Sequence, residues 1–373
     1  SETERNLVEV AGDMAVAGTD AEAEEVMVPA TESFGRAGME SIGERAKQIW
    51  DKVLAMLKKI SEKIASFFYK IFGSVPSRRR NLKALRATVD KISDKTIDKD
   101  NKKFKVTSTK GLTVNNQAVK TAAGFQSAVN DSVAAIKWGL EDYTSALKNV
   151  GEKLADIVGD FDADKPEVFA KAVVGTMDKF PKVPGGSVEA GDRFGGMTAY
   201  VGTALLGNRS LAARQPKSGD VKGASGSDLH KLEMVRRSTY LMVPSNYKKD
   251  EAASDFEFET LTSSQMEKLL DSVETILDQI EQFSRGQKAK DISAARKKIE
   301  TASSKASAAW DKRMDDKDNK PSEQQRALFK AALGFNLSYA GWAKEPVASL
   351  IQHGLHVTST VFALVAKSAA LHK

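Results

Sequence analysis

The feature that most constrains the fold is a recurrence of apolar residues every three or four positions, sustained over long stretches of the chain. In the segment 117–158 this step holds from Phe125 to Ile157. Such spacing lines up side chains on one face of an α-helix, whereas a half-buried strand would alternate apolar and polar residues. The same step returns at 41–73, 166–180, 262–310 and 322–373. We therefore expect a mainly α (α+β) fold of long packed helices.

The middle of the chain departs from this pattern. Glycines and prolines cluster between residues 181 and 260, and the segments 198–206 and 232–243 have the composition of extended chain. We predict a small glycine-rich β element here. Residues 104–114 alternate and are rich in Thr and Val, which predicts a short hairpin.

The net charge of +6 is unevenly distributed. Residues 1–40 hold ten acids and two bases, a net charge of −8, whereas residues 45–110 hold 19 bases and six acids, a net charge of +13. The acidic segment has too little apolar content to offset the entropy lost on ordering, so we expect it to be a disordered leader. The predicted organisation is this leader (1–40), a basic amphipathic and long-helix region (41–180), the β-containing element (181–260), and a helical hairpin followed by a C-terminal helical pair (261–373).

Few residues of the kinds used in catalysis are available. The absence of cysteine excludes a disulfide scaffold, a thiolate zinc site and a cysteine nucleophile. Asp160, Asp162 and Asp164 have the spacing that opens a calcium loop, but lysines replace its glycine and its closing glutamate. His353 and His356 lie one helical turn apart with no third ligand nearby. We predict a protein that is not an enzyme and that has no metal or cofactor.

No membrane-spanning helix is expected, because no window approaches 18 uninterrupted apolar residues. The N-terminal segment also lacks the basic and apolar regions of a signal peptide.

A helical hairpin is predicted after the β element. Thr262 and Gln265 have the spacing of a capping box, and a near-heptad apolar seam follows as far as Phe283. Smaller side chains return over 292–310, with a turn expected at 285–290. The segment 262–283 is therefore expected to pack on 292–310. Ser322 and Gln325 have the same capping spacing before a further helix, which is expected to break near Pro346.

The helix expected at 41–73 is strongly amphipathic, with lysines largely opposite its apolar face. The apolar face comprises Ile49, Trp50, Val53, Leu57, Ile60, Ile64, Phe67, Phe68 and Ile71. Three alternatives fit this pattern: packing on its own domain, contact with a membrane surface, or docking on a partner helix.

A basic run at 78–105 follows this helix. Its candidate phosphate ligands are Arg78, Arg79, Arg80, Lys83 and Arg86. Such residues bind duplex DNA or another polyanion without reading bases, and sparse aromatic residues disfavour specific binding of single strands. The alternative is a solvated basic surface paired with the acidic leader.

Several pieces of the sequence, in order, resemble one family. The acidic leader precedes AKQIWDKVLAMLKKISEKIASFFYKIFG at 46–73, and Pro184-Gly185-Gly186 precedes an L-L-G-N-R motif at 205–209. Pro346-Val347 then introduces an alanine-rich C-terminal helix. These pieces resemble the internal head (inner-body) proteins of phiKZ-like giant tailed bacteriophages. The C-terminal His372-Lys373 departs from the aromatic ending expected of them.

This resemblance implies a structural virion protein packaged with DNA inside the capsid, after a stage in the host cytoplasm during assembly. It also implies delivery with the genome, contacts with head-shell or other internal head proteins, and trimming by a prohead protease after small-x-Glu. The matching cleavage positions are Glu25, Glu32 and Glu40. The competing hypothesis is a membrane-active or effector protein that acts at a membrane surface through the helix 41–73.

Overall fold

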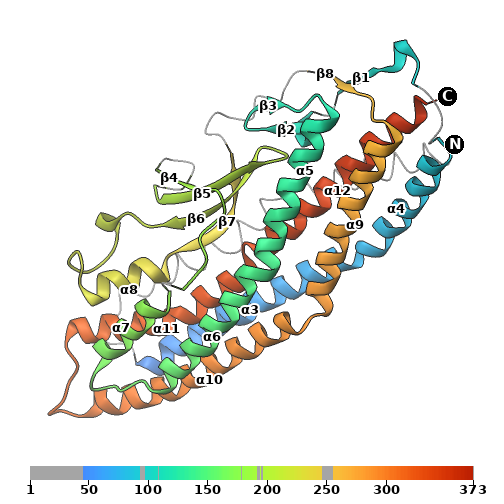
Figure 1. The fold of residues 1–373 in the computed structure, drawn as a ribbon. Helices are drawn as coiled ribbons and strands as arrows, with labels where there is room; N and C mark the ends of the chain where they lie inside the picture. Colours follow the sequence, from blue (N-terminus) through green and yellow to red (C-terminus); the bar gives the residue numbers. More distant parts are fainter. Residues whose placement is uncertain are drawn as a thin grey trace.

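In the part of the chain that the structure describes, the long helices follow one another in end-to-end pairs and form four broken rods (Figure 1). The computed structural model describes residues 45–92, 97–107, 109–177, 179–190, 194, 196–245 and 255–372. The rods are α3 (Ala46–Gly73) with α4 (Val75–Asp90); α5 (Ala122–Lys137), the π-helical segment η3 (Trp138–Tyr143) and α6 (Thr144–Gly159); α9 (Ser263–Arg285) with α10 (Gln287–Asp315); and α11 (Glu323–Lys344) with α12 (Val347–Ala370). The mainly α fold predicted from the sequence is confirmed.

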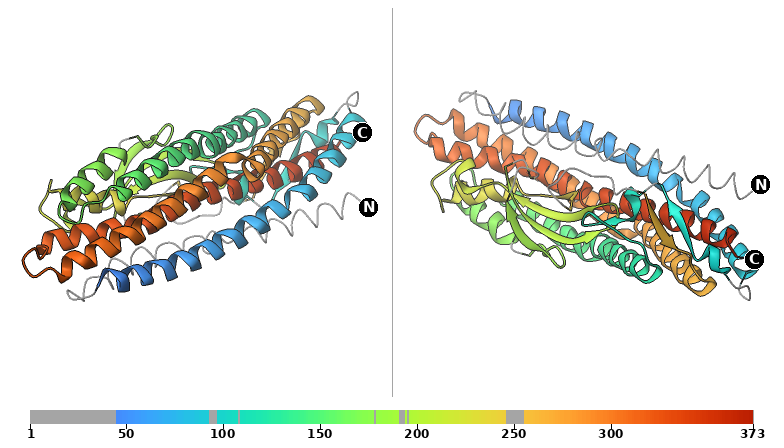
Figure 2. Two further views of the ribbon diagram at one scale, coloured as in Figure 1. Left: turned by 90° about the horizontal axis from the view of Figure 1, so that it is seen from below. Right: turned by 90° about the horizontal axis from the view of Figure 1, so that it is seen from above.

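Two groups of four helices lie end to end along the molecule. Helices α4, α5, α9 and α12 pack together at one end, and α3, α6, α10 and α11 pack together at the other (Figures 1 and 2). The second group contains a hydrophobic cluster shared by α3, α10 and α11, in which the rings of Trp310 and Phe329 stack at 4.4 Å. Each group buries the apolar stripe of every helix, which explains the three- and four-residue steps in the sequence.

All four rods are interrupted in one cross-sectional layer. The Tyr143 hydroxyl of η3 donates to the carbonyl oxygens of Trp342 (2.8 Å) and Glu345 (3.2 Å), where α11 ends. The Lys288 ammonium, at the start of α10, lies 3.3 Å from the Glu141 carbonyl oxygen of η3. The rings of Phe68 and Phe283, near the breaks at Ser74 and Gly286, are 6.3 Å apart. We call this layer the waist.

Both capping boxes expected from the sequence are present. The Thr262 hydroxyl accepts from the Gln265 backbone N–H (3.2 Å) and starts α9, and Ser322 and Gln325 start α11 in the same way. Each cap stabilises its helix by about 1 kcal/mol. Thr121 caps α5, so this rod begins at Ala122 and not at residue 117 as expected.

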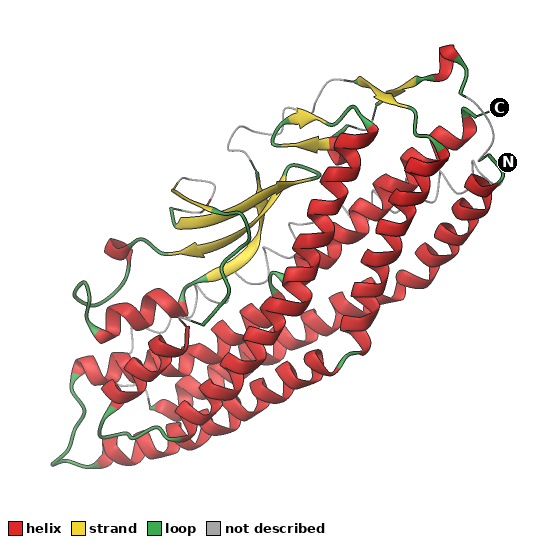
Figure 3. Ribbon diagram, in the orientation of Figure 1, coloured by secondary structure: helices red, strands yellow, loops and turns green. Residues whose placement is uncertain are grey.

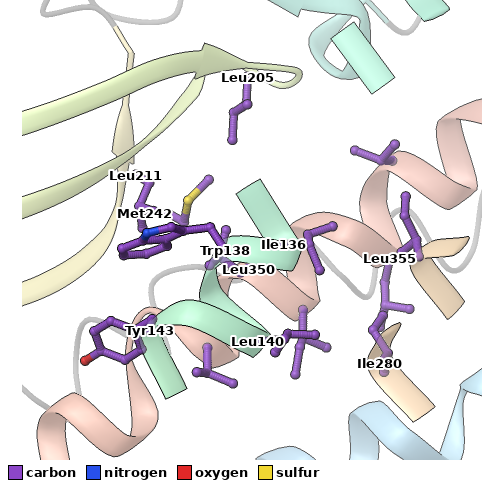
Figure 4. Packing of buried hydrophobic residues seen from close by; sticks show 14 of the residues in the cluster. Ile136, Trp138, Leu140, Tyr143, Leu205, Leu211, Met242, Ile280, Leu350 and Leu355 are labelled. Carbon is purple, nitrogen blue, oxygen red and sulfur yellow. The ribbon is translucent and has the colours of Figure 1, made fainter. Parts of the chain in front are cut away.

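The β element is an antiparallel four-stranded sheet in the order β4-β5-β6-β7, lying on one side of the helices (Figure 3). Its strands are β4 (Ser187–Ala190), β5 (Thr198–Leu205), β6 (Arg209–Gln215) and β7 (Thr239–Pro244). Leu205, Leu211 and Met242 point from the sheet toward Trp138 and Leu350 of the helices (Figure 4). The two short helices α7 (Pro166–Met177) and α8 (Asp228–Arg236) pack on α11. The expectation of extended chain throughout 232–243 is wrong, since α8 occupies its first half and leaves only β7 extended.

The predicted hairpin at 104–114 is also wrong. β1 (Lys103–Val106) pairs with the distant β8 (Phe256–Glu259), while β2 (Thr113–Val114) pairs with β3 (Gln117–Ala118). The rings of Phe104 and Phe258 lie 5.7 Å apart on the first of these pairs. This aromatic contact between residues far apart in the sequence stabilises the pairing of β1 with β8, and a local alternation pattern carries no information about it.

The predicted packing of 262–283 on 292–310 as a helical hairpin is wrong. α10 packs along α6, whereas α9 packs on α4, α5 and α12, so α9 and α10 do not lie face to face. Their connection is the single extended residue Gly286, which is too short to reverse the chain. A Cβ at Gly286 would lie 2.5 Å from the Gln282 carbonyl oxygen, so this close turn requires glycine. The reversal is at 316–322, between α10 and α11.

Candidate nucleic-acid interface

The apolar face of α3 lies inside the bundle, against α10 and α11. Trp50, Val53, Leu57, Ile60 and Ile71 are buried, and the rest of the predicted face is half-buried, namely Ile49, Ile64, Phe67 and Phe68. The Trp50 indole N–H donates to the Ser304 hydroxyl of α10 (2.8 Å). Of the three alternatives for this helix, the structure therefore has the first, packing on its own domain.

Two of the five predicted phosphate ligands on α4 are engaged by carboxylates of α9. The Arg79 guanidinium lies 2.6 Å from both Asp278 and Glu281. Its hydrogen bond to Glu281 raises the pKa of Arg79 and lowers the pKa of Glu281. Arg86 lies 2.6 Å from Glu274 and 2.9 Å from Asp271. These arginines join α4 to α9.

The other three predicted ligands divide between core and surface. Arg78 is buried, whereas Arg80 and Lys83 are exposed on α4. The five phosphate ligands predicted from the sequence therefore do not form one phosphate-binding surface. Two of them, Arg80 and Lys83, face solvent.

α3 adds exposed lysines beside α4. The lysines at 52, 59, 63 and 70 are separated by steps of seven, four and seven, so they follow one line of the helix, and those at 47 and 58 lie on its other flank. Two exposed acids, Asp51 and Glu62, lie between these flanks on the outward side. The α3 surface is therefore basic but interrupted.

α10 carries a basic surface without exposed acids such as those of α3, and the sequence analysis missed it. Its exposed lysines are Lys290, Lys297, Lys298, Lys305 and Lys312, here called the α10 lysine row. At about 100° per residue they fall within one arc of roughly 100°, opposite the buried Ile292, Ile299 and Trp310. Along α10, which the structure describes in full, the acids between Lys290 and Lys312 are half-buried, and Asp291 and Glu300 lie 3.4 Å from Lys148 and 3.7 Å from Arg296. The sequence pattern that could have predicted this row is the near-heptad spacing of its lysines among small residues.

The two basic helices are neighbours. The Asp311 carboxylate of α10 accepts from the backbone N–H groups of Ala46 (2.8 Å) and Lys47 (3.2 Å), at the start of α3. Arg45 pairs with Asp315 at 2.8 Å. Seen from below, α3 and α10 share one side of the molecule (Figure 2). We call the α10 lysine row together with the exposed lysines of α3 the α3–α10 basic surface.

The chemistry of this surface is that of solvated ammonium groups on rigid helices. Such groups meet phosphates as point charges, with little dependence on base sequence. Among the described residues there is no cluster of three or more potential metal ligands. The Asp162 carboxylate accepts from the Asp164 backbone N–H (2.9 Å) in a turn before α7. His353 is buried beside the Ser132 hydroxyl (2.9 Å).

A family model matches residues 2–367, and it describes the phiKZ-like phage internal head proteins. This chain belongs to that family. No curated protein and no solved structure matches it. The match covers the acidic leader, the helical rods and the sheet alike.

Family membership makes the chain a structural internal head protein, located inside the phage capsid. The cleavage positions Glu25, Glu32 and Glu40 lie outside the described residues. In the described part of this internal head protein, Glu323–Ala370 is the one helical stretch long and apolar enough to cross a membrane. Most of its apolar window is buried inside the bundle, as in a core helix.

Proposed function

We propose that this internal head protein is packaged together with double-stranded DNA and contacts it without sequence specificity through the α3–α10 basic surface. The observation that carries the proposal is the α10 lysine row, five exposed lysines on one arc with no exposed acid among them. Arg80 and Lys83 of α4 extend the basic character along the same rod as α3.

The dimensions of the row suit a duplex. From Lys290 to Lys312 the helix rises about 33 Å at ~1.5 Å per residue, which is close to one turn of B-DNA at ~34–36 Å. Because each DNA strand returns to the same face of the duplex after one turn, a duplex laid along α10 would offer phosphates of one strand to both ends of the row. Each phosphate neutralised releases condensed counterions, so binding should weaken steeply as salt rises.

The proposal includes the life cycle that the family resemblance implies. The protein would assemble in the host cytoplasm, contact head-shell or other internal head proteins, lose its leader to a prohead protease after Glu25, Glu32 or Glu40, and be delivered with the genome. Mass spectrometry of purified particles tests the maturation step, since it identifies the mature N-terminus. An intact leader in every particle would refute it. No catalytic role, metal or cofactor forms part of the proposal.

Salt-dependent binding to duplex DNA tests the proposed contact. In the chain beginning at Ser41, we expect replacement of the α10 lysine row by glutamine to weaken binding and to flatten the log–log salt dependence. The slope should fall by roughly 0.9 for each lysine that meets a phosphate.

The matched control removes five exposed lysines from other parts of the protein, at positions 171, 182, 217, 222 and 231. Both variants lose the same charge, so a general electrostatic effect would change both slopes equally. Equal slopes in the two variants would refute a specific role for the α10 row. An absence of salt-dependent binding in the parent chain would refute the DNA contact itself.

A further inference from the structure

We propose that the acidic leader, residues 1–40, occupies the α10 lysine row in the full-length chain and excludes DNA from it. The competition with DNA rests on the proposed function. The location of the leader on α10 does not depend on DNA binding and is tested without DNA.

The leader joins the described fold at Arg45, at the start of α3. The first described residue, Arg45, pairs with Asp315, and the backbone N–H groups of Ala46 and Lys47 donate to Asp311. A carboxylate at a helix N-terminus is a favourable arrangement, because it meets unpaired N–H donors and the positive end of the helix dipole. The start of α3 is therefore fixed beside the C-terminal end of α10. The chain preceding Arg45 begins within a turn or so of Lys312.

The leader is long enough to span the α10 lysine row. The row extends about 33 Å from Lys312 to Lys290 at ~1.5 Å per residue. An extended chain covers ~3.3 Å per residue, so roughly ten residues span the whole row. The leader is several times longer than this. Its acids at positions 20, 22, 24, 25, 32 and 40 are spread over the part of the chain nearest to the fold.

The charge of α10 complements the acidic leader better than the charges of the neighbouring α3 and α4 do. The outward side of α3 carries Asp51 and Glu62 between its two lines of lysines, and those carboxylates repel an acidic segment. Arg79 and Arg86 of α4 already have carboxylate partners on α9. The α10 row has five exposed lysines and no exposed acid between its ends. Among the described basic surfaces next to Arg45, it is the best complement to a segment of net charge −8.

Occupancy of the row by the leader would compete with DNA. A tethered segment has an effective concentration on the order of millimolar near its own attachment point, so weak individual contacts suffice. Exposed charges are screened over ~8–10 Å at physiological ionic strength, so the competition should fade as salt rises. Removal of the leader would expose the row to DNA.

Carbodiimide cross-linking of the full-length protein, read by mass spectrometry, tests the location without DNA. It joins carboxylates to lysines in direct contact. We expect leader carboxylates to be joined mainly to Lys297, Lys298, Lys305 and Lys312. Leader links spread evenly over the exposed lysines of the chain, or concentrated on Lys52, Lys59 and Lys63 of α3, would overturn the proposal.

DNA binding tests the competition. We expect the chain beginning at Ser41 to bind duplex DNA several-fold more tightly than the full-length chain at low salt, with a difference that shrinks as salt rises. In the five-lysine α10 variant this difference should disappear, whereas the control variant at 171, 182, 217, 222 and 231 should keep it.

A leader effect that survives in the α10 variant would overturn the inference while leaving the DNA contact intact. If neither chain binds DNA, the proposed function fails. The cross-links then still decide whether the leader lies on α10.

Discussion

Acidification should destabilise this protein through one buried histidine. His353 of α12 is buried, and its Nε2 atom lies 2.9 Å from the Ser132 hydroxyl of α5. Burial lowers the pKa of His353 to about 3, with smaller contributions from His356 and Arg209. The imidazole is therefore neutral in the folded protein throughout the physiological pH range. In the unfolded chain its pKa is about 6.5.

The sign and size of the effect follow from these two pKa values. Because the folded-state pKa is depressed, the unfolded chain binds the proton more readily, and stability falls as pH falls. The contribution of His353 is fully present above about pH 6.5 and is lost progressively toward pH 3. At roughly 1.4 kcal/mol per pH unit, acidification to pH 4.5 should remove about 3 kcal/mol of the free energy of unfolding.

Urea unfolding at pH 7.0, 5.5 and 4.5 measures this loss, with His353→Gln as the matched variant. Glutamine keeps a polar partner for Ser132 but does not titrate in this range. The carboxylates of the chain are the same in both proteins, so the difference between the two pH dependences isolates the histidine. We expect the variant to be less stable at pH 7.0 and to lose much less stability on acidification. Parallel pH dependences would refute the reasoning.

Four further predictions concern the fold and its surfaces. Leu269→Asp should destabilise the protein by several kcal/mol in urea unfolding, because Leu269 is 1% exposed and the carboxylate would be buried without a partner; wild-type stability would contradict this packing. Gly286→Ala should lower the free energy of unfolding by about 1–3 kcal/mol, because the new methyl group would lie 2.5 Å from a backbone carbonyl oxygen. An unchanged melting temperature would show that the backbone here can move to accommodate the methyl group. Replacing Arg79 and Arg86 with Ala should lower stability by about 1 kcal/mol or less per partly exposed ion pair without changing the salt dependence of DNA binding; a flatter slope would return these arginines to the phosphate-binding set. In liposome flotation, the isolated 41–73 peptide should bind vesicles and the folded chain should not, because the apolar face of α3 is covered; binding by the folded chain would support the membrane-active alternative.

The sequence predicted the elements far better than their partners. The three- and four-residue steps identify which face of a helix is buried, and the side chains of Thr262 and Ser322 mark where two helices begin. The same steps do not identify what covers the face. The seam of α9 resembles half of a hairpin, but it meets α4, α5 and α12, and Gly286 joins α9 to α10 without a reversal.

The sequence predicted that the protein has a basic surface, but not which residues form it. Net charge pointed to a basic surface in the first part of the chain, yet Arg79 and Arg86 are engaged by carboxylates of α9, which lies far along the sequence. Only the fold brings those groups together. The lysine row of α10 could have been found from its near-heptad spacing, because positions seven and eight apart return to the same side of a helix.

The waist affects how the molecule responds to force. A continuous helix resists bending along its whole length, but here every rod changes hydrogen-bonding pattern or connection in the same layer, at Ser74, η3, Gly286 and Pro346. Among the described residues no unbroken α-helix crosses that layer, so a transverse load will concentrate its strain there. The two halves should then tilt as stiff segments joined by a compliant middle. Under such a load the molecule can change its curvature without unpacking either half.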